Sequence, residues 1–495
     1  MGLPGPPIDT PVALCYPRSN PKPQEGMMSK NGGMANGKMT KNFPVFDCDA
    51  HINDPLKIWE YVEPKYKDLV QQSYWRNEKQ AILNGKKKVI GGARYEFSPG
   101  FNPICISGPG MTKPIKRKLI YSQLNEDQKD YLEHQGAYEP HARIKDLDLM
   151  GIDAVMIIPT LLVGHFPFIE NADGAAALAR AYNNWADDFC SANRERLHAA
   201  GWLPVQNAEY AADELRRIAK MGVRVALVRP IDAQGNYPNK IYPSWGGINW
   251  DKVFRAFEET NTVVGMHTFP TTGVGPTDKP MFTPGELIDL TAHGNGMAQG
   301  INSQTLSFIY EATTWLAQVL LSGFLERYPK LKMSILESNS TWLPGILERL
   351  DRYFHLYASQ RTAPVKRLPS EAFYDQMFIS FESDETPMFR QWDKFENVAV
   401  WASDAYHHDA SDSWSAIREM SEVEVPEAVQ AKMLGGNAYR MYRIEPKMFV
   451  HEQKPIERPA WFPKPAELEE FARVQKDPKL AREWQAKMMA GRAGH

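Results

Sequence analysis

Apolar strand candidates alternate with helix candidates along most of this chain. Short runs rich in Val, Ile and Phe recur eight times, and the segments between them have helical periodicity. The runs are FPVFDCDAHI, GIDAVMIIPT, HAAGWLPV, VRVALVRP, TVVGMHT, KMSILES, QMFISFES and NVAVWASD. Strands that are apolar on both faces belong in parallel sheets covered by helices. Eight such units therefore predict an α/β protein with a closed (β/α)₈ barrel, the TIM barrel.

The main helix candidates follow these strands. They span 175–196, 209–221, 250–261, a long segment from Ser303 towards Arg327, 342–359 and 387–395. No repeat of 20 to 50 residues is visible, which argues against a solenoid.

Three segments interrupt or flank the predicted barrel, which spans residues 42–444. Residues 1–41 are rich in Pro, Gly, Asn and Lys and predict a flexible arm. Residues 55–140 break the alternation after the first strand and predict a large insertion that covers the pocket. Residues 445–495 start with a Pro-rich stretch and predict a C-terminal extension that wraps the barrel or a neighbouring subunit, so a homo-oligomer, such as a dimer, is expected.

Charge and cysteine content exclude several classes of function. The net charge of −3, with acids and bases interspersed, predicts no binding to nucleic acid or to anionic membranes. The apolar run 154–164 is too short to span a bilayer, and Pro159 interrupts it. The four cysteines have no CxxC spacing, so neither a disulfide framework nor a thiolate zinc site is indicated. We expect a reducing, cytoplasmic setting and a small-molecule substrate.

Metal-ligand residue types stand at the ends of four strand candidates. Asp49 and His51 alternate at the end of the first run, so an extended chain would point both to one face. His267, Glu337 and Asp404 end three later runs, and the adjacent His407 and His408 follow closely. Each has a structural alternative, as a turn, a core histidine or a helix cap. Their coincidence at the functional face of a barrel favours a metal site.

These strand ends, together with PKLKMSILESNSTWLPGILERLD, ASDAYHHD and LGGNAYRMY, resemble the amidohydrolase superfamily. The similarity is to the branch related to aminocarboxymuconate semialdehyde decarboxylase and covers about residues 43–442. It implies a metal at the mouth of the barrel, ligated by Asp49, His51, His267 and Asp404. Either of the two adjacent histidines could face the metal: His407 suits a supporting or substrate-contacting role, and His408 is a further candidate ligand.

The chain departs from the family pattern at two positions. Asp49 stands where the family has the first His of HxH, and Glu337 stands where it has a His on strand six. Carboxylate oxygens are hard ligands, so replacing imidazoles by carboxylates favours Mn, Fe or Mg, and Zn is also compatible. The ligand set suffices for one or two divalent ions, and Glu337 could bridge two.

Two further residues are candidates for substrate binding. Arg229 ends the fourth strand candidate and could bind a substrate carboxylate or phosphate, or pair with Glu382. His165 follows the second strand candidate and lines the pocket or lies on a loop surface.

The resemblance implies a metal-dependent enzyme for non-oxidative decarboxylation or hydrolysis of a small organic acid, ester or amide. Asp404 would act at the reacting centre, and Glu337 or His407 would move the proton. The carboxylate-rich site also suits a dinuclear iron or iron/manganese monooxygenase. A third possibility is a non-catalytic barrel that acts as a partner subunit.

Overall fold

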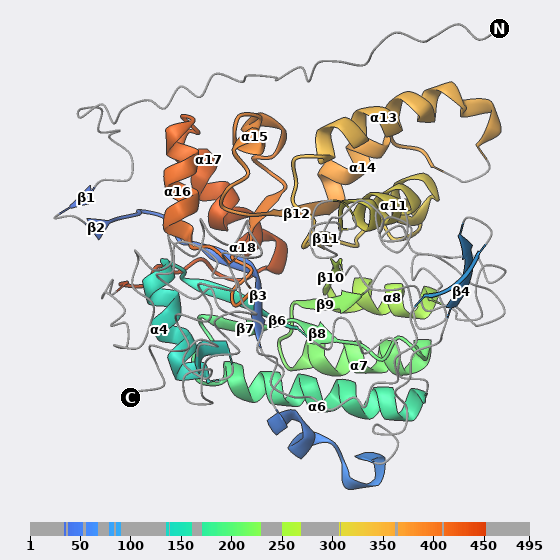
Figure 1. The fold of residues 1–495 in the computed structure, drawn as a ribbon, viewed down its shortest axis with the longest axis horizontal. Coiled ribbons are helices and arrows are strands. Elements are labelled where there is room, and N and C mark those ends of the chain that lie inside the picture. Colours follow the sequence, from blue (N-terminus) through green and yellow to red (C-terminus); the bar gives the residue numbers. More distant parts are fainter. Residues whose placement is uncertain are drawn as a thin grey trace, which may run out of the picture.

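The computed structural model (Figure 1) describes residues 34–35, 38–52, 56–67, 79–83, 86–90, 135–137, 139–160, 171–228, 250–268, 306, 308–361, 365–407 and 410–451. Most of the predicted insertion, residues 1–33 and residues 452–495 lie outside these ranges.

All eight predicted strands are present and run parallel to their neighbours. One sheet contains β3 (Phe46–Ile52), β6 (Ala154–Pro159) and β7 (Leu197–Ala199). The second contains, in order, β8 (Gly201–Trp202), β9 (Val225–Val228), β10 (Val263–His267), β11 (Met333–Leu336), β12 (Met377–Phe381) and β13 (Ala399–Trp401). The third predicted strand is thus divided at Ala200 into β7 and β8.

The first and last strands of this series lie side by side. A parallel bridge pairs Ala50 of β3 with Ala405, just beyond β13. The Asp404 N–H also donates a hydrogen bond to the Asp49 carbonyl over 3.0 Å. The carboxyl ends of β3 and β13 are therefore neighbours, although some 350 residues separate them in the chain.

Helices cover the strands on the outside (Figure 1). They are α4 (Pro140–Met150), α6 (Ala172–Cys190), α7 (Ala208–Lys220), α8 (Asp251–Thr260), α11 (Phe308–Leu321), α12 (Phe324–Arg327), α13 (Leu343–Leu356), α14 (Pro369–Gln376), α15 (Thr386–Phe389), α16 (Ser413–Glu422), α17 (Glu427–Ala431) and α18 (Asn437–Tyr442). No helix in the described part of the chain is both long enough and apolar enough to cross a membrane.

Helix α7 shows how local sequence sets these elements. Asn207 caps it by accepting hydrogen bonds from the N–H groups of Glu209 and Tyr210. Leu215 and Ile218 lie on its buried face, three residues apart. The predicted boundaries differ from the observed ones by one residue at each end.

Two helix predictions were wrong. The long helix predicted up to Arg327 is interrupted at Ser322 and Gly323, because Gly323 adopts a left-handed conformation with φ of 74° and starts a separate helix, α12. The predicted helix 387–395 is instead the short α15 and a 3₁₀ turn over Trp392–Lys394.

Lys41, the last residue of the predicted N-terminal arm, contacts the rest of the chain. Its side chain is 2% exposed and forms an ion pair with the buried Asp153. Asp153 also accepts hydrogen bonds from the N–H groups of Val45 and Phe449, both at 2.7 Å. The start of the C-terminal extension therefore packs beside the residues that precede β3.

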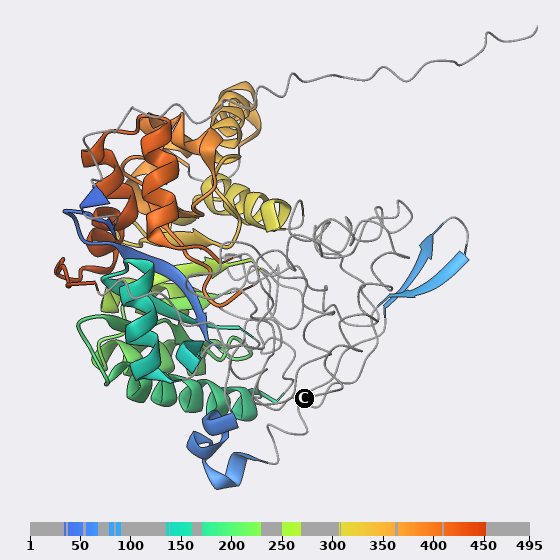
Figure 2. The same ribbon diagram turned by 60° about the vertical axis from the view of Figure 1, so that its left-hand side comes forward.

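Two short antiparallel pairs lie outside the main sheets. They are β1 (Met34–Ala35) with β2 (Lys38–Met39), and β4 (Lys79–Leu83) with β5 (Lys86–Ile90). The second pair projects away from the main strands (Figure 2) and belongs to the predicted insertion.

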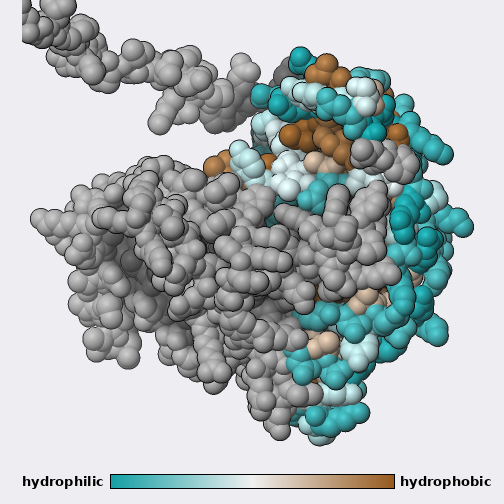
Figure 3. All heavy atoms as spheres, turned by 90° about the vertical axis from the view of Figure 1, so that its right-hand side faces the viewer, coloured by the Kyte–Doolittle hydropathy of each residue, from teal (hydrophilic) through white to brown (hydrophobic). Residues whose placement is uncertain are grey.

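Apolar side chains gather on the face formed by α11 and α13 (Figure 3). Leu321, Leu356 and Tyr357 are all exposed there, and Leu321 and Tyr357 line a groove of about 420 Å³. The expected homo-oligomer stays a prediction, because one chain does not test it.

We expect the packing of the C-terminal extension to depend on pH through His451. Burial disfavours its charged form, but contacts with Asp148 and Asp153 (3.1 Å) outweigh burial and raise the pKa of His451. The stability that protonated His451 contributes is full below its unfolded pKa near 6.5 and is lost as pH rises through the higher folded pKa. We expect His451→Gln to lower the urea midpoint more at pH 6 than at pH 9. An equal shift at both values would contradict this assignment.

Candidate metal centre

Six of the predicted site residues meet at the carboxyl ends of the strands. Two overlapping groups have potential ligand atoms within 4.8 Å of one another, and both contain His51 and Glu337. The first group adds Asp49 and His267, and the second adds Asp404 and His407. The structure thus brings these six residues together, and their roles as ligands or catalytic groups stay predictions.

His51 lies at the centre of the cluster. Its Nε2 atom is 3.3 Å from Asp49 Oδ1, 3.4 Å from Asp404 Oδ1 and 3.3 Å from His267 Nε2. His267 Nε2 is 3.6 Å from Asp49 Oδ2 and 3.9 Å from Glu337 Oε2.

Hydrogen bonds aim the Nε2 lone pairs of both histidines into the cluster. The Thr160 hydroxyl donates to the Ile52 carbonyl over 2.6 Å, so its contact with His51 Nδ1 at 3.2 Å is donated by the imidazole. His267 Nδ1 lies 2.6 Å from the Thr268 carbonyl, which can only accept. Both Nε2 atoms are then available as ligands.

The electrostatics of the cluster fit a cation. Both Asp49 carboxylate oxygens are buried and accept no hydrogen bond from the described part of the chain. Burial raises the pKa of Asp49, and burial followed by the charge of Arg143 lowers the pKa of His51 to about 3. Converging lone pairs without protons between them repel one another, and a divalent ion would remove this repulsion.

Glu337 and Asp404 stand just beyond their strands in strained backbone conformations. Their φ angles are 56° and 49°, a left-handed region that costs energy for residues other than glycine. The buried Glu385 stabilises the chain after Glu337 by accepting hydrogen bonds from the N–H groups of Ser340 and Thr341 at 2.8 and 3.1 Å. The fold thus maintains a strained conformation that directs carboxylates towards the cluster.

Asp47 is a positioning residue that the sequence reasoning did not assign. Its buried carboxylate accepts hydrogen bonds from the Ser403 N–H at 3.0 Å, the Ser403 hydroxyl at 2.5 Å and the Asp49 N–H at 3.2 Å. It therefore ties the strand that carries Asp49 to the residue before Asp404. The sequence did contain a hint: Asp47 lies two residues before Asp49 on the same strand, so its side chain faces the same side of that strand.

Arg143 of α4 contacts the backbone of the cluster, and the sequence reasoning did not assign this residue either. This buried guanidinium donates from Nη2 to the His51 carbonyl over 2.5 Å and lies 4.5 Å from the centre of the Tyr406 ring. The Tyr406 hydroxyl in turn donates to Asp146 at 2.6 Å. The sequence gave no reason to assign this role, because Arg143 lies on α4 and not at the end of a predicted strand.

Glu337 and His407 are the most accessible members of the cluster. Their side chains are 13% and 19% exposed, whereas the side chains of Asp49, His51 and His267 are at most 3% exposed. His407 Nδ1 lies 2.7 Å from Asp404 Oδ1, and its ring stacks on His51 with centroids 3.9 Å apart. A substrate would reach these two side chains first.

Three predicted site residues lie outside the described residues. They are His165, Arg229 and His408. Their expected roles, and the alternative pairing of Arg229 with Glu382, stay predictions.

The chain matches a known family over more than half of its length. The model of the amidohydrolase family matches residues 159–444, which include β9 to β13. The chain belongs to the amidohydrolase family. The resemblance in the sequence to this superfamily is therefore confirmed.

Solved structures of this fold include amidohydrolases and decarboxylases. An amidohydrolase from Mycobacterium avium subsp. paratuberculosis K-10 is 19% identical with a TM-score of 0.56, and the match covers 81% of this chain and 100% of that chain. The 5-carboxyvanillate decarboxylase from Sphingomonas paucimobilis is 18% identical with a TM-score of 0.54 and coverage of 82% and 100%. At these identities the similarity shows the fold.

A third structure was solved with a metal. The 5-carboxyvanillate decarboxylase from Novosphingobium aromaticivorans, complexed with manganese and 4-hydroxy-3-methoxy-5-nitrobenzoic acid, is 18% identical with a TM-score of 0.55 and coverage of 84% and 100%. No curated protein sequence matches this chain. The monooxygenase alternative gains no support from these comparisons.

Replacing Asp47 tests whether its carboxylate positions the cluster. Burial raises the pKa of Asp47 to about 7, although the hydrogen bonds from Ser403 oppose this shift. In metal-free protein, the stability associated with protonated Asp47 is present below about pH 4 and is lost as pH rises through about 7. We expect Asp47→Asn, which resembles the protonated acid, to reduce this loss by a few kcal/mol.

Urea unfolding in the presence of a chelator, between pH 5 and pH 8, would measure the difference between the two proteins. Ser403→Ala is the matched control: removing the hydroxyl that stabilises the carboxylate should move the loss to higher pH. A difference between wild type and Asp47→Asn that does not change with pH would refute the assignment.

Proposed function

We propose that this amidohydrolase is a metal-dependent enzyme that removes a carboxylate from a small organic acid without oxidation, and that its strands close into a (β/α)₈ barrel. The observation that carries this proposal is the cluster of buried carboxylates and correctly oriented imidazoles at the carboxyl ends of the strands. The decarboxylases that share the fold support the choice of reaction.

The proposed metal ligands are the deeply buried members of the cluster and their carboxylate neighbours. Asp49, His51, His267 and Asp404 would hold the ion, with Glu337 close enough to join or to bridge two ions. This mixture of oxygen and nitrogen ligands suits manganese or iron, and zinc remains compatible. When bound, the ion would polarise a substrate oxygen and favour development of negative charge there.

Decarboxylation also needs a proton at carbon. The bond between the substrate carbon and its carboxylate breaks, carbon dioxide leaves, and a proton takes its place on that carbon. His407 is suited to supply it, because its side chain is partly exposed and its Nδ1 lies 2.7 Å from Asp404 Oδ1, whose negative charge favours the protonated ring. Glu337, which is also partly exposed, is the second proton donor to test.

Hydrolysis of an ester or amide is the close variant of this proposal. The same ligands would serve, and Glu337 would take a proton from water instead of giving one to carbon. Release of carbon dioxide distinguishes the two reactions.

Metal removal tests the proposal directly. We expect chelation to abolish release of carbon dioxide from a panel of hydroxybenzoates that includes 5-carboxyvanillate, and manganese to restore it. Asp404→Asn should weaken metal binding and lower activity by at least tenfold, as loss of a ligand or of its support does. Arg216→Gln, on the exposed face of α7, is the matched surface control. Full activity of metal-free protein, verified by elemental analysis, would exclude the proposal.

Separate substitutions distinguish the two proton donors. We expect His407→Gln to reduce kcat by about 10² to 10⁴ while metal content is unchanged, which is the scale of general acid catalysis. Glu337→Gln should reduce both kcat and metal content if Glu337 is a ligand, and kcat alone if it acts only on protons. If His407→Gln keeps wild-type kcat, the proton comes from another group.

A further inference from the structure

Thr268, the residue after β10, contacts two members of the metal cluster through two different groups. Its hydroxyl donates a hydrogen bond to the Glu337 carbonyl. Its own carbonyl lies 2.6 Å from His267 Nδ1, which donates to it. Thr268 is fully buried, and its N–H also donates to the Leu336 carbonyl at the end of β11 over 3.4 Å. One residue therefore links the backbone of Glu337 to the imidazole of His267.

Glu385 holds the chain on the other side of Glu337. Oε2 of its buried carboxylate accepts from the N–H and hydroxyl of Ser340 at 2.8 and 2.9 Å. The same oxygen accepts from the N–H and hydroxyl of Thr341 at 3.1 and 2.9 Å. Its Oε1 accepts from the Glu382 N–H, just after β12, over 3.1 Å. The carboxylate therefore ties the turn after β11 to the chain after β12.

The turn between these two attachments is strained. Glu337 and Asn339 have φ angles of 56° and 53°, a left-handed region that Asn tolerates better than Glu. Such a conformation persists only when the surrounding structure holds it. Relaxation of the turn would move the Glu337 carboxylate, whose Oε2 lies 3.9 Å from His267 Nε2. The bonds of Thr268 and Glu385 are suited to prevent this movement.

A purely structural role would explain only part of this arrangement. Ser340 and Thr341 lie just before α13, so Glu385 could simply satisfy the N–H groups at the start of that helix. The Thr268 hydroxyl, however, bonds to Glu337 itself, six residues before the helix begins. The contact that the helix does not require is the one made to a member of the cluster.

We propose that Thr268 and Glu385 are positioning residues that fix the Glu337 carboxylate beside His267, so that both side chains bind the same ion. This inference rests on the metal centre of the proposed function and extends it to two residues that contact neither ion nor substrate. The Thr268 carbonyl would orient His267, and its hydroxyl would orient Glu337. Loss of the hydroxyl alone would then release Glu337 and leave His267 in place.

Binding of Mn²⁺ to the full chain, measured from the electron paramagnetic resonance signal of the free ion, tests the proposal. We expect Thr268→Val, which removes the hydroxyl and keeps the carbonyl, to raise the Kd about tenfold or more, as loss of a contact that orients a ligand does. Thr268→Ser keeps the hydroxyl and should bind as wild type does. Glu385→Gln should weaken binding similarly, because an amide nitrogen cannot accept from N–H groups.

A cycle of single and double variants shows whether the effect passes through Glu337. Glu337→Gln should itself raise the Kd about tenfold or more. Adding Thr268→Val to Glu337→Gln should then change the Kd by less than about twofold, because the carboxylate that the hydroxyl positions is already lost. If Thr268→Val does not fold, Thr341→Val, which removes one donor to Glu385, takes its place in the same cycle.

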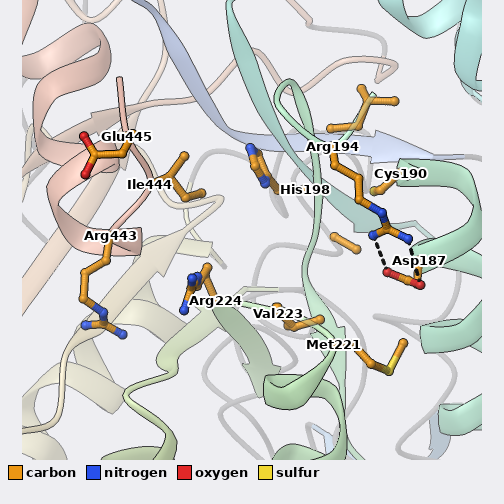
Figure 4. Close-up of a pocket in the computed structure, with 13 residues that line it drawn as sticks. Asp187, Cys190, Arg194, His198, Met221, Val223, Arg224, Arg443, Ile444 and Glu445 are labelled. Carbon is orange, nitrogen blue, oxygen red and sulfur yellow. Dashed lines mark hydrogen bonds and ion pairs between the residues drawn. The ribbon is translucent and has the colours of Figure 1, made fainter. Parts of the chain in front are cut away.

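Two controls remove comparable contacts far from the cluster. Thr260→Val removes a hydroxyl that donates to the Ala256 carbonyl over 2.7 Å at the end of α8. Arg194→Gln breaks the bidentate pair with Asp187, at 2.6 and 3.1 Å, beside the amino ends of the strands (Figure 4). Both variants should keep the wild-type affinity for Mn²⁺ within about twofold.

Three results would overturn the proposal. They are wild-type affinity in Thr268→Val or in Glu337→Gln, an equal effect of Thr268→Val in both backgrounds, and a Kd for Thr268→Ser as high as that of Thr268→Val. Any of them together with release of carbon dioxide by wild type would leave the proposed reaction standing. Binding of Mn²⁺ that follows the expected pattern without release of carbon dioxide would instead contradict the reaction and support the positioning role.

Discussion

The metal cluster depends on the hydrogen bonds that Asp47 accepts from Ser403. These bonds connect the first strand of the series to the chain just beyond the last one, and so bring Asp49 beside Asp404. The adjacent backbone bond from Asp404 to Asp49 alone would leave the relative positions of the two strands less tightly defined. A buried carboxylate is expensive to desolvate, so its three donors indicate that the cost is offset by accurate placement of the cluster.

Within the cluster, the hydrogen-bonding needs of the Asp49 carboxylate are not met by other described protein groups. Neutral imidazole nitrogens face the two Asp49 oxygens, which accept no hydrogen bond from the described residues, and Glu337 and Asp404 have left-handed backbones. A cluster optimised only for the stability of the fold would instead place a donor hydrogen between each pair of acceptors and would keep the backbone in ordinary conformations. Such local conflict is expected at functional sites, where the bound partner supplies the missing interaction. Here the missing interaction is with a cation.

The sequence predicted the strands and the residues at their ends, because both depend on local patterns. Apolar runs marked β10 and β11, and His267 and Glu337 end these runs. It did not predict the division of the long helix at Gly323 or the burial of Lys41. Both depend on tertiary structure: a left-handed glycine within an apolar helical pattern gives a weak signal, and Asp153, the partner of Lys41, is 112 residues away.

The carboxyl ends of the strands carry a charge imbalance that bears on function. They gather carboxylate oxygens without enough donors, as at Asp49. This imbalance lowers the stability of the metal-free chain, so a cation bound there would stabilise the folded state by mass action. Because the strands that carry the cluster are buried and close-packed, the bound ion would stabilise the core as well as the site.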